Sequence, residues 1–210
     1  MKKIIISLLI FIILVIVFVL GYQNVVSAKT NVIESNWALR FKKIHDVDVV
    51  GKKYPLPIQR AKIYVKEMIY WAGYWGLARP EILPAIAEAE GNIVNRGKFK
   101  DGTYKDGSPK YGLGLYHMQK DTAKWLWQKY NLDRLFGAYA DWKVIDPTEA
   151  GTCLAALYIK FCLNNNDNNY TLAIYQWNFG NSEGVNLYNV QLNHVLRVLG
   201  FMEIYSNLRL

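Results

Sequence analysis

The sequence contains few residues of the kinds that hold a fold together through covalent bonds or metal ions. Its 210 residues include two cysteines and three histidines. Cys153 and Cys162 are spaced roughly 13 Å along a predicted helix, whereas a disulfide needs Cα atoms within about 7 Å. We therefore expect both to be free, buried and apolar in character. His45, His117 and His194 are too scattered to indicate a zinc site, and the sequence predicts neither a metal nor a cofactor.

Acidic residues are scarce relative to basic ones. The chain has 17 Asp and Glu against 25 Lys and Arg, which gives a formal net charge of +8. This charge would favour an anionic surface such as phospholipid, wall polymer or nucleic acid. It is equally consistent with a solubilising face on a lysine-rich chain. No nucleic-acid-binding motif accompanies the charge, so nucleic acid is not an expected partner.

Charged residues are absent from Ile4 to Leu20, a run in which Ser7 is the one hydroxyl residue. Such a run is just long enough to span a bilayer, which takes about 20 apolar residues with a lower limit near 17. Two lysines precede it and predict a cytoplasmic N-terminus with the rest of the chain exported. A signal peptide cleaved after Val26-Ser27-Ala28 is the alternative. We expect an uncleaved single-pass anchor in the cell membrane over residues 1–21; cleavage would give a secreted protein.

The rest of the chain is expected to form a tether and one helical domain on the extracytoplasmic side. Residues 22–57 show no sustained periodicity and end at Pro55-Leu56-Pro57, which indicates a tether. Residues 58–210 form the expected domain, whose fold class is mainly α. Apolar periodicity predicts helices over residues 58–75, 80–90, 120–130, 146–163, 172–176 and 182–200.

Two local signals refine this division. Asp146-Pro147-Thr148-Glu149 offers a capping Asp, a Pro suited to the first helical position and a Glu that can reach back to the cap. It is the clearest helix start in the chain. Residues 91–114 contain six glycines, including those of Asp101-Gly102 and Asp106-Gly107. These turn dipeptides predict a small β-hairpin or irregular insert after the second helix of the domain.

Glu90 ends the apolar stretch that begins at Ile82. A carboxyl group at the inner end of such a stretch is expected to be partly desolvated, and desolvation favours the neutral acid that a proton donor requires. An isolated Glu at a helix end is, as a rule, a solvated surface residue. Glu88 lies about 200° around the helix from Glu90 and is expected to face solvent. Whether Glu90 is isolated depends on the rest of the chain.

Three separated segments share a pattern with a known family. Ala87-Glu88-Ala89-Glu90-Gly91 ends a predicted helix, Gly114–Ala123 follows the insert, and Leu172–Gly180 follows the helix that starts at Asp146-Pro147. In type and order they resemble the soluble lytic transglycosylase family of the lysozyme-like superfamily, over roughly residues 58–200. That family has a Glu-Ser pair ending a helix, a Gly-Leu-Met-Gln-type strand leading to Thr-Ala, and an Ala-Tyr-Asn-Ala-Gly-type segment. The resemblance implies an α+β lysozyme-like domain.

The resemblance also implies roles for individual residues. Glu90 takes the place of the catalytic acid, and Tyr175 takes the place of a tyrosine whose hydroxyl lies near that acid. Substrate binding is implied for the cleft-lining strand Gly114, Leu115, Tyr116 and His117, and for Gln176, Trp177 and Asn178.

The chain departs from the family pattern at three places. Gly91 stands where Ser is usual, His117 where Gln is usual, and Gln176-Trp177 where a small Asn-Ala pair is usual. These departures affect the expected contacts to substrate more than the expected fold.

The implied reaction is cleavage of the β-1,4 bond between N-acetylmuramic acid and N-acetylglucosamine in peptidoglycan strands. Glu90 would protonate the bridging oxygen and then act as base on the muramyl 6-hydroxyl, which closes a 1,6-anhydro ring. A lysozyme-type muramidase would need a second carboxylate. Asp101 and Asp106 lie where one could stand, but their Asp-Gly context favours turns. A catalytically silent peptidoglycan-binding module is the third hypothesis, motivated by Gly91 and His117. The sequence indicates no protein partner.

Overall fold

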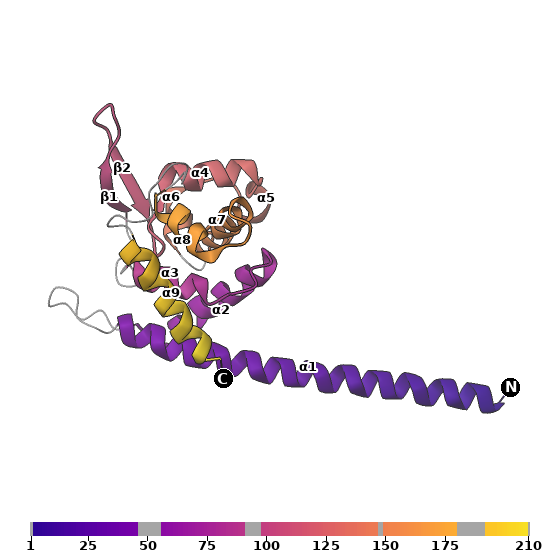
Figure 1. Ribbon diagram of the computed structural model, residues 1–210. Coiled ribbons are helices and arrows are strands. Elements are labelled where there is room, and N and C mark those ends of the chain that lie inside the picture. Colours follow the sequence, from indigo (N-terminus) through magenta and orange to yellow (C-terminus); the bar gives the residue numbers. More distant parts are fainter. Residues whose placement is uncertain (1, 46–55, 91–97, 147–148, 180–191, 210) are drawn as a thin grey trace.

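The computed structural model describes residues 2–45, 56–90, 98–146, 149–179 and 192–209. Within these ranges the protein is mainly helical with one small antiparallel sheet, which confirms the predicted class (Figure 1). A long helix, α1 (Lys2–His45), projects from a helical body. The body contains α2 (Ile58–Tyr74), α3 (Ile82–Ala89), α4 (Lys120–Lys129), α5 (Asp133–Phe136), α6 (Asp141–Ile145), α7 (Gly151–Asn165), α8 (Tyr170–Phe179) and α9 (Leu192–Asn207).

The predicted hairpin is present and protrudes from the body (Figure 1). Strand β1 (Lys98–Thr103) pairs antiparallel with β2 (Pro109–Leu113), which pairs with the two-residue β3 (Met118–Gln119). The hairpin turn contains Asp106, whose carboxylate accepts hydrogen bonds from the backbone N–H of Ser108 at 2.9 Å and from its hydroxyl at 2.7 Å. Gly107 follows with φ +82°, the left-handed conformation that favours glycine. Asp106 is therefore a turn residue, as its Asp-Gly context predicts.

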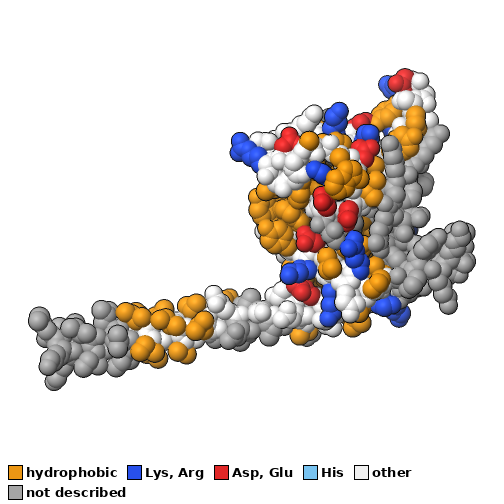
Figure 2. Space-filling model, turned by 180° about the vertical axis from the view of Figure 1, so that it is seen from behind, with side chains coloured by type: hydrophobic (Ala, Val, Ile, Leu, Met, Phe, Trp, Pro, Cys, Tyr) orange, Lys and Arg blue, Asp and Glu red, His pale blue; other side chains and the backbone are white. Residues whose placement is uncertain are grey.

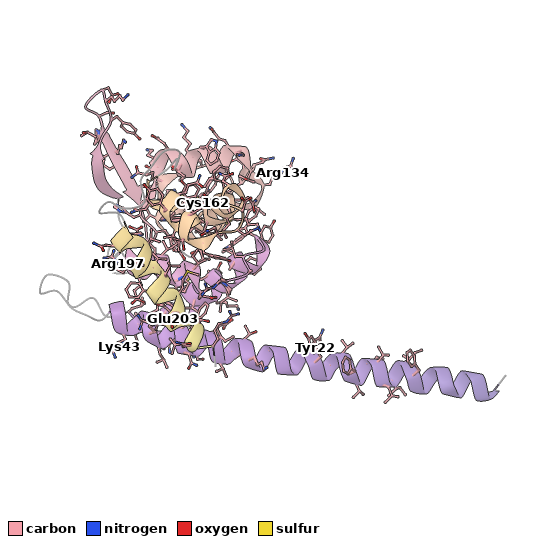
Figure 3. The ribbon with its side chains drawn as sticks, viewed as in Figure 1. Tyr22, Lys43, Arg134, Cys162, Arg197 and Glu203 are labelled. Carbon is pink, nitrogen blue, oxygen red and sulfur yellow. The ribbon has the colours of Figure 1, made fainter. Side chains whose placement is uncertain are left out.

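Helix α3 lies at the centre of the body. Seven of its eight residues are buried, and the side chain of the eighth, Glu88, is 8% exposed. Helix α9 packs along α3, and α7 packs against α8 and α2. Cys153 and Cys162 on α7 are fully buried and free, which confirms the prediction, and burial raises the pKa of each thiol to about 12. Figure 3 shows Cys162 within the helical body.

Helix α1 differs from the expected anchor and tether because it is one continuous helix through residue 45. Its inner end joins the core: Trp37, Ala38 and Phe41 are fully buried. The indole N–H of Trp37 donates a 2.8 Å hydrogen bond to the carbonyl of Tyr205 on α9. Tyr22 lies on the projecting part of α1, and Lys43 lies at the end that packs on the body (Figure 3). The segment expected to be a tether therefore contributes part of the core.

The apolar run of α1 is exposed. All ten residues from Phe11 to Leu20 have large apolar side chains that are 44–74% exposed. Figure 2 shows an apolar band on the visible face of the projecting helix. Nevertheless, among the described residues no helix meets both the length and the hydropathy that a membrane span requires.

Two helix boundaries differ from the predicted ones. Asp146 follows α6 with an extended backbone (ψ 114°) and donates its N–H to the carbonyl of Trp142 at 3.1 Å, so α7 begins later, at Gly151. A residue before proline is biased towards this extended conformation. Helix α9 does not end at Gly200 but continues to Asn207. The start predicted at Ser182 lies outside the described residues.

Candidate functional site

Glu90 forms the C-terminal cap of α3, at the point where the buried helix reaches the surface of the body. Its backbone N–H donates to the carbonyl of Ile86 at 2.9 Å, and its side chain is 13% exposed. The carboxyl group is therefore largely shielded from water, as predicted. Gly91, the neighbour that departs from the family pattern, lies outside the described residues.

Charged contacts hold α3 at its N-terminal end. Glu81, immediately before the helix, is almost fully buried and accepts hydrogen bonds from Arg79 at 2.9 Å and Arg209 at 3.3 Å. A carboxylate at this end also complements the helix dipole. These contacts restrain the start of the helix that carries Glu90.

The prediction that Glu88 faces solvent was wrong. Its side chain is 8% exposed and accepts two hydrogen bonds from the Arg40 guanidinium of α1, one of them at 3.0 Å. Burial raises the pKa of Glu88, although its bonds to Arg40 act in the opposite direction. The prediction was wrong because the inner end of α1 covers this face of α3, and that contact leaves no mark in the local pattern of α3.

At its C-terminal end α3 is held by α9. The guanidinium of Arg197 donates a hydrogen bond to the carbonyl of Ala89, directly before Glu90. Figure 3 shows Arg197 on the part of α9 that lies beside α3.

Two histidines bring their rings to opposite oxygens of the Glu90 carboxyl group. His117 Nδ1 lies 3.8 Å from Glu90 Oε2, and His194 Nε2 lies 3.7 Å from Glu90 Oε1. Burial lowers the pKa of His194, and the nearby Glu90 charge opposes that shift only in part. Sequence spacing gave no sign of this cluster, because the three side chains come from α3, the turn before β3 and α9.

Gly114 to His117 form a turn between β2 and β3 and not the expected cleft-lining strand. Gly114 has φ +65°, and a Cβ there would lie 2.8 Å from the carbonyl oxygen of Val144, so the turn packs tightly on α6. Leu115 and Tyr116 are 2% exposed and lie in the core. Of the four residues, His117 is the one that lines the cavity described next.

A cavity of about 580 Å³ opens beside Glu90 and His117. This volume lies within the usual range for small-molecule sites, roughly 300–1,000 Å³. Trp177 and Tyr158 form an aromatic wall, with ring centroids 5.2 Å apart. As far as the described residues define it, the lining consists of Glu90, Tyr104, Lys110, His117, Met118, Gln119, Asp121, Thr122, Tyr158, Trp177 and Asn178.

The expected residues of α8 divide between the cavity and the interior. Trp177 and Asn178 line the cavity. Tyr175 is 3% exposed and lies in the core, outside the described lining. Gln176 is 9% exposed, and its side-chain oxygen accepts a 2.6 Å hydrogen bond from Asn166. Since successive helical residues are rotated by about 100°, four consecutive residues of α8 do not share one wall.

Residues of the hairpin and of α4 together line one side of the cavity. The hydroxyl of Tyr104 donates a hydrogen bond to the Asp121 carboxylate, which raises the pKa of Tyr104. Lys110 Nζ lies 5.1 Å from the centre of the Tyr104 ring. Asp121 is thus a second acidic residue of the cavity, which the motif comparison did not single out. Asp101 lies in strand β1, so the turn predicted from Asp101-Gly102 was wrong; its side chain is outside the described residues.

This arrangement suits proton transfer to a bound ligand, because a shielded carboxyl group lies at one edge of a partly aromatic cavity. Within the described ranges, no three His, Cys, Asp or Glu side chains are grouped so as to hold a metal ion. No family model, curated protein or solved structure matches the chain.

Proposed function

We propose that the protein is a peptidoglycan lytic transglycosylase with a lysozyme-like domain and Glu90 as its catalytic acid. The observation that carries the proposal is the position of Glu90, whose side chain is 13% exposed at the edge of the cavity. Four of the residues to which the resemblance assigns a role line the cavity: Glu90, His117, Trp177 and Asn178. Three segments far apart in the sequence thus meet around one space.

The proposed reaction is an intramolecular displacement on the muramyl ring. Protonated Glu90 gives its proton to the bridging oxygen as the bond from that oxygen to C1 breaks. The muramyl 6-hydroxyl oxygen then bonds to C1 and loses its proton, which restores the protonated acid. No water is consumed, so the reaction does not require the second carboxylate of a hydrolase.

The aromatic wall supports a carbohydrate substrate. Trp177 and Tyr158 present flat apolar surfaces with polar edges, a combination that suits a sugar ring with apolar faces and hydroxyl rims. The side chain of Asn178 offers both a donor and an acceptor beside them. The proposed ligands are therefore peptidoglycan glycan strands.

A membrane location is proposed from α1. The ten exposed apolar residues from Phe11 to Leu20 are consecutive, so they cover all sides of the helix and not a single stripe. A helix in contact with lipid on all sides needs such a distribution. Lys2 and Lys3 lie at the N-terminal end of the same helix. With the N-terminus on the cytoplasmic side, the body would stand on the extracytoplasmic side, where peptidoglycan is found.

A lysozyme-type muramidase is the second candidate, and Asp121 is the observation that favours it. This carboxylate lines the same cavity as Glu90 and is a candidate for activating water on the far side of the sugar. The two candidates differ in product, because hydrolysis leaves a reducing end and the transglycosylase leaves a 1,6-anhydro ring.

The test is digestion of purified peptidoglycan by the full chain in mild detergent, with mass spectrometry of the released fragments. We expect anhydro-muropeptides from the wild type and none from Glu90→Gln. Glu203→Gln is the matched control, since Glu203 is an exposed residue of α9. Reducing ends that disappear in Asp121→Asn would support the muramidase instead. Binding of glycan without any cleavage would refute both enzymes and leave a silent binding module.

A further inference from the structure

In the proposed reaction, Glu90 acts first as the acid and then as the base, yet a second group that can bind a proton, the His117 ring, lies beside it at the edge of the cavity. His117 Nδ1 lies 3.8 Å from Glu90 Oε2, and both side chains line the cavity. His194 approaches the other oxygen at 3.7 Å but is not part of the described lining. Substrate in the cavity would therefore contact Glu90 and His117 together, and not His194.

The His117 ring is fixed in this position by the backbone around it. The residue has φ +50°, an uncommon value for a side chain other than glycine. Its ring lies against Gly112, where a Cβ would come within 2.1 Å of His117 Cδ2. Its Nε2 is buried, so Nδ1 is the ring nitrogen directed towards Glu90 and the cavity. A strained backbone that serves to aim one ring is typical of functional sites.

We propose that His117 is a second catalytic group, which shares one proton with Glu90 and acts as the base while Glu90 acts as the acid. This inference rests on the proposed transglycosylase function and divides its two proton transfers between two residues. It assigns a role to the histidine that stands where the related family has Gln.

The proton balance closes without an outside donor. The Glu90 proton moves to the bridging oxygen as the bond to C1 breaks. The 6-hydroxyl oxygen bonds to C1, and its proton moves to His117 Nδ1. The product leaves a protonated His117 beside an ionised Glu90. These groups lie 3.8 Å apart, so a water that enters the emptied cavity carries the proton back and restores the starting state.

Substrate binding itself selects the reactive form of the pair. With one shared proton, the pair is either an ion pair or a neutral acid beside a neutral base, and both forms hold the same number of protons. Water in the open cavity stabilises the ion pair. Sugar rings that displace this water penalise the charged form and shift the proton to Glu90. The acid and the base are then generated in one step, when the substrate is in place.

The surrounding groups set the pH range. Activity requires one proton on the pair, so it falls at low pH, when the pair takes up a second proton, and at high pH, when the pair loses its single proton. Burial lowers the pKa of His194 and thereby favours its neutral form. Among the described residues, the other titratable or charged groups near the pair or in the cavity lining are Arg197 on α9, Lys110 on β2, Tyr104 in the hairpin turn, Asp121 on α4 and Tyr158 on α7.

The experiment compares the wild type with His117→Gln, His117→Ala and His194→Gln as full chains in mild detergent, acting on soluble peptidoglycan fragments. Formation of anhydro product gives kcat and KM across a pH series. We expect His117→Gln to lower kcat about 10²–10⁴-fold, the usual contribution of a general base, with little change in KM. The acid limb of the pH profile should disappear in this variant and remain in His194→Gln. Added imidazole should partly restore kcat in His117→Ala.

The outcomes separate this inference from the function on which it rests. If the wild type makes anhydro product and Glu90→Gln does not, the proposed function stands. If His117→Gln then keeps the wild-type kcat and the acid limb, His117 is not a base and the inference is overturned. Loss of kcat without rescue by imidazole and with the acid limb unchanged would also overturn it, because a purely structural role would have that result. A wild type without anhydro product would refute the function and the inference together.

Discussion

The contact between Arg40 and Glu88 makes a quantitative prediction about how α1 joins the body. Glu88 is 8% exposed and Arg40 is 24% exposed. The Arg40 guanidinium also lies 5.3 Å from the ring centre of Tyr205 and 5.8 Å from that of Phe201. Replacing Arg40 by Met keeps most of the apolar stem but leaves a buried carboxylate without its cation. Breaking a buried pair in this way costs about 3–5 kcal/mol.

The measurement is thermal unfolding of the full chain in mild detergent. For a chain of this size, 1 kcal/mol shifts Tm by about 2–4 °C, so Arg40→Met should lower Tm by roughly 6–20 °C. Arg60→Met is the matched control, because Arg60 also lies over a tyrosine ring, at 5.2 Å from the centre of Tyr64. Its ion pair with Asp146 is 3.9 Å long, and the two side chains are 43% and 38% exposed. Such a pair contributes up to about 1 kcal/mol.

The double variant Arg40→Met/Glu88→Met separates charge from packing. It should recover most of the lost stability, because a buried ion pair replaced by apolar side chains of similar volume is often neutral. Two results would refute the reasoning: an Arg40→Met variant as stable as Arg60→Met, or a double variant no more stable than Arg40→Met. Either would mean that α1 does not enclose Glu88 in solution.

Three further predictions concern the same elements. Burial raises the pKa of Glu88 in the folded protein. The stabilisation from protonated Glu88 is therefore complete below its unfolded-state pKa of about 4.3 and is lost as the pH rises through its folded-state pKa. Urea unfolding at a series of pH values should show this loss of stability in the wild type and not in Glu88→Gln. Gly112→Ala should displace the His117 ring and lower kcat. Gly73→Ala is the control: a Cβ there meets open space within α2, so this variant should keep the wild-type kcat and raise Tm. Equal kcat in the two variants would contradict the position of the His117 ring against Gly112. Trp177→Ala should raise KM for glycan fragments by removing part of the aromatic wall, and an unchanged KM would exclude Trp177 from the binding surface.

The longer helices of the body were predictable because apolar residues recur along them at helical spacing, whereas the short α5 and α6 were not predicted and α5 has no buried residue. Ala61, Val65, Met68 and Ala72 repeat at helical spacing along α2, and all four are buried. The hairpin was predictable for a different reason, since Asp106-Gly107 encodes its turn locally. Both signals lie within a few residues of the structure that they determine.

The features that sequence reasoning missed depend on contacts between distant elements. Trp37 and Phe41 lie in a stretch without regular periodicity, and their burial depends on α9 and α2 far along the chain. His194 contacts Glu90 only because α9 packs along α3. Tyr175 belongs to a matching motif, yet the rotation of α8 places it in the core. Motif order thus located the region of the candidate site and four of its lining residues. It did not distinguish these from motif residues whose side chains are buried, such as Leu115, Tyr116 and Tyr175.

The position of Glu90 depends on both ends of the chain. Helix α3 has only eight residues. Besides the neighbouring Arg79, three arginines from distant segments contact its ends: Arg40, Arg197 and Arg209. A chain that began at residue 58 would lack Arg40, and it would also lose the indole of Trp37 that bonds to α9. Glu88 would then be left without its cation, two residues before Glu90. The unit that positions Glu90 therefore includes the inner end of α1.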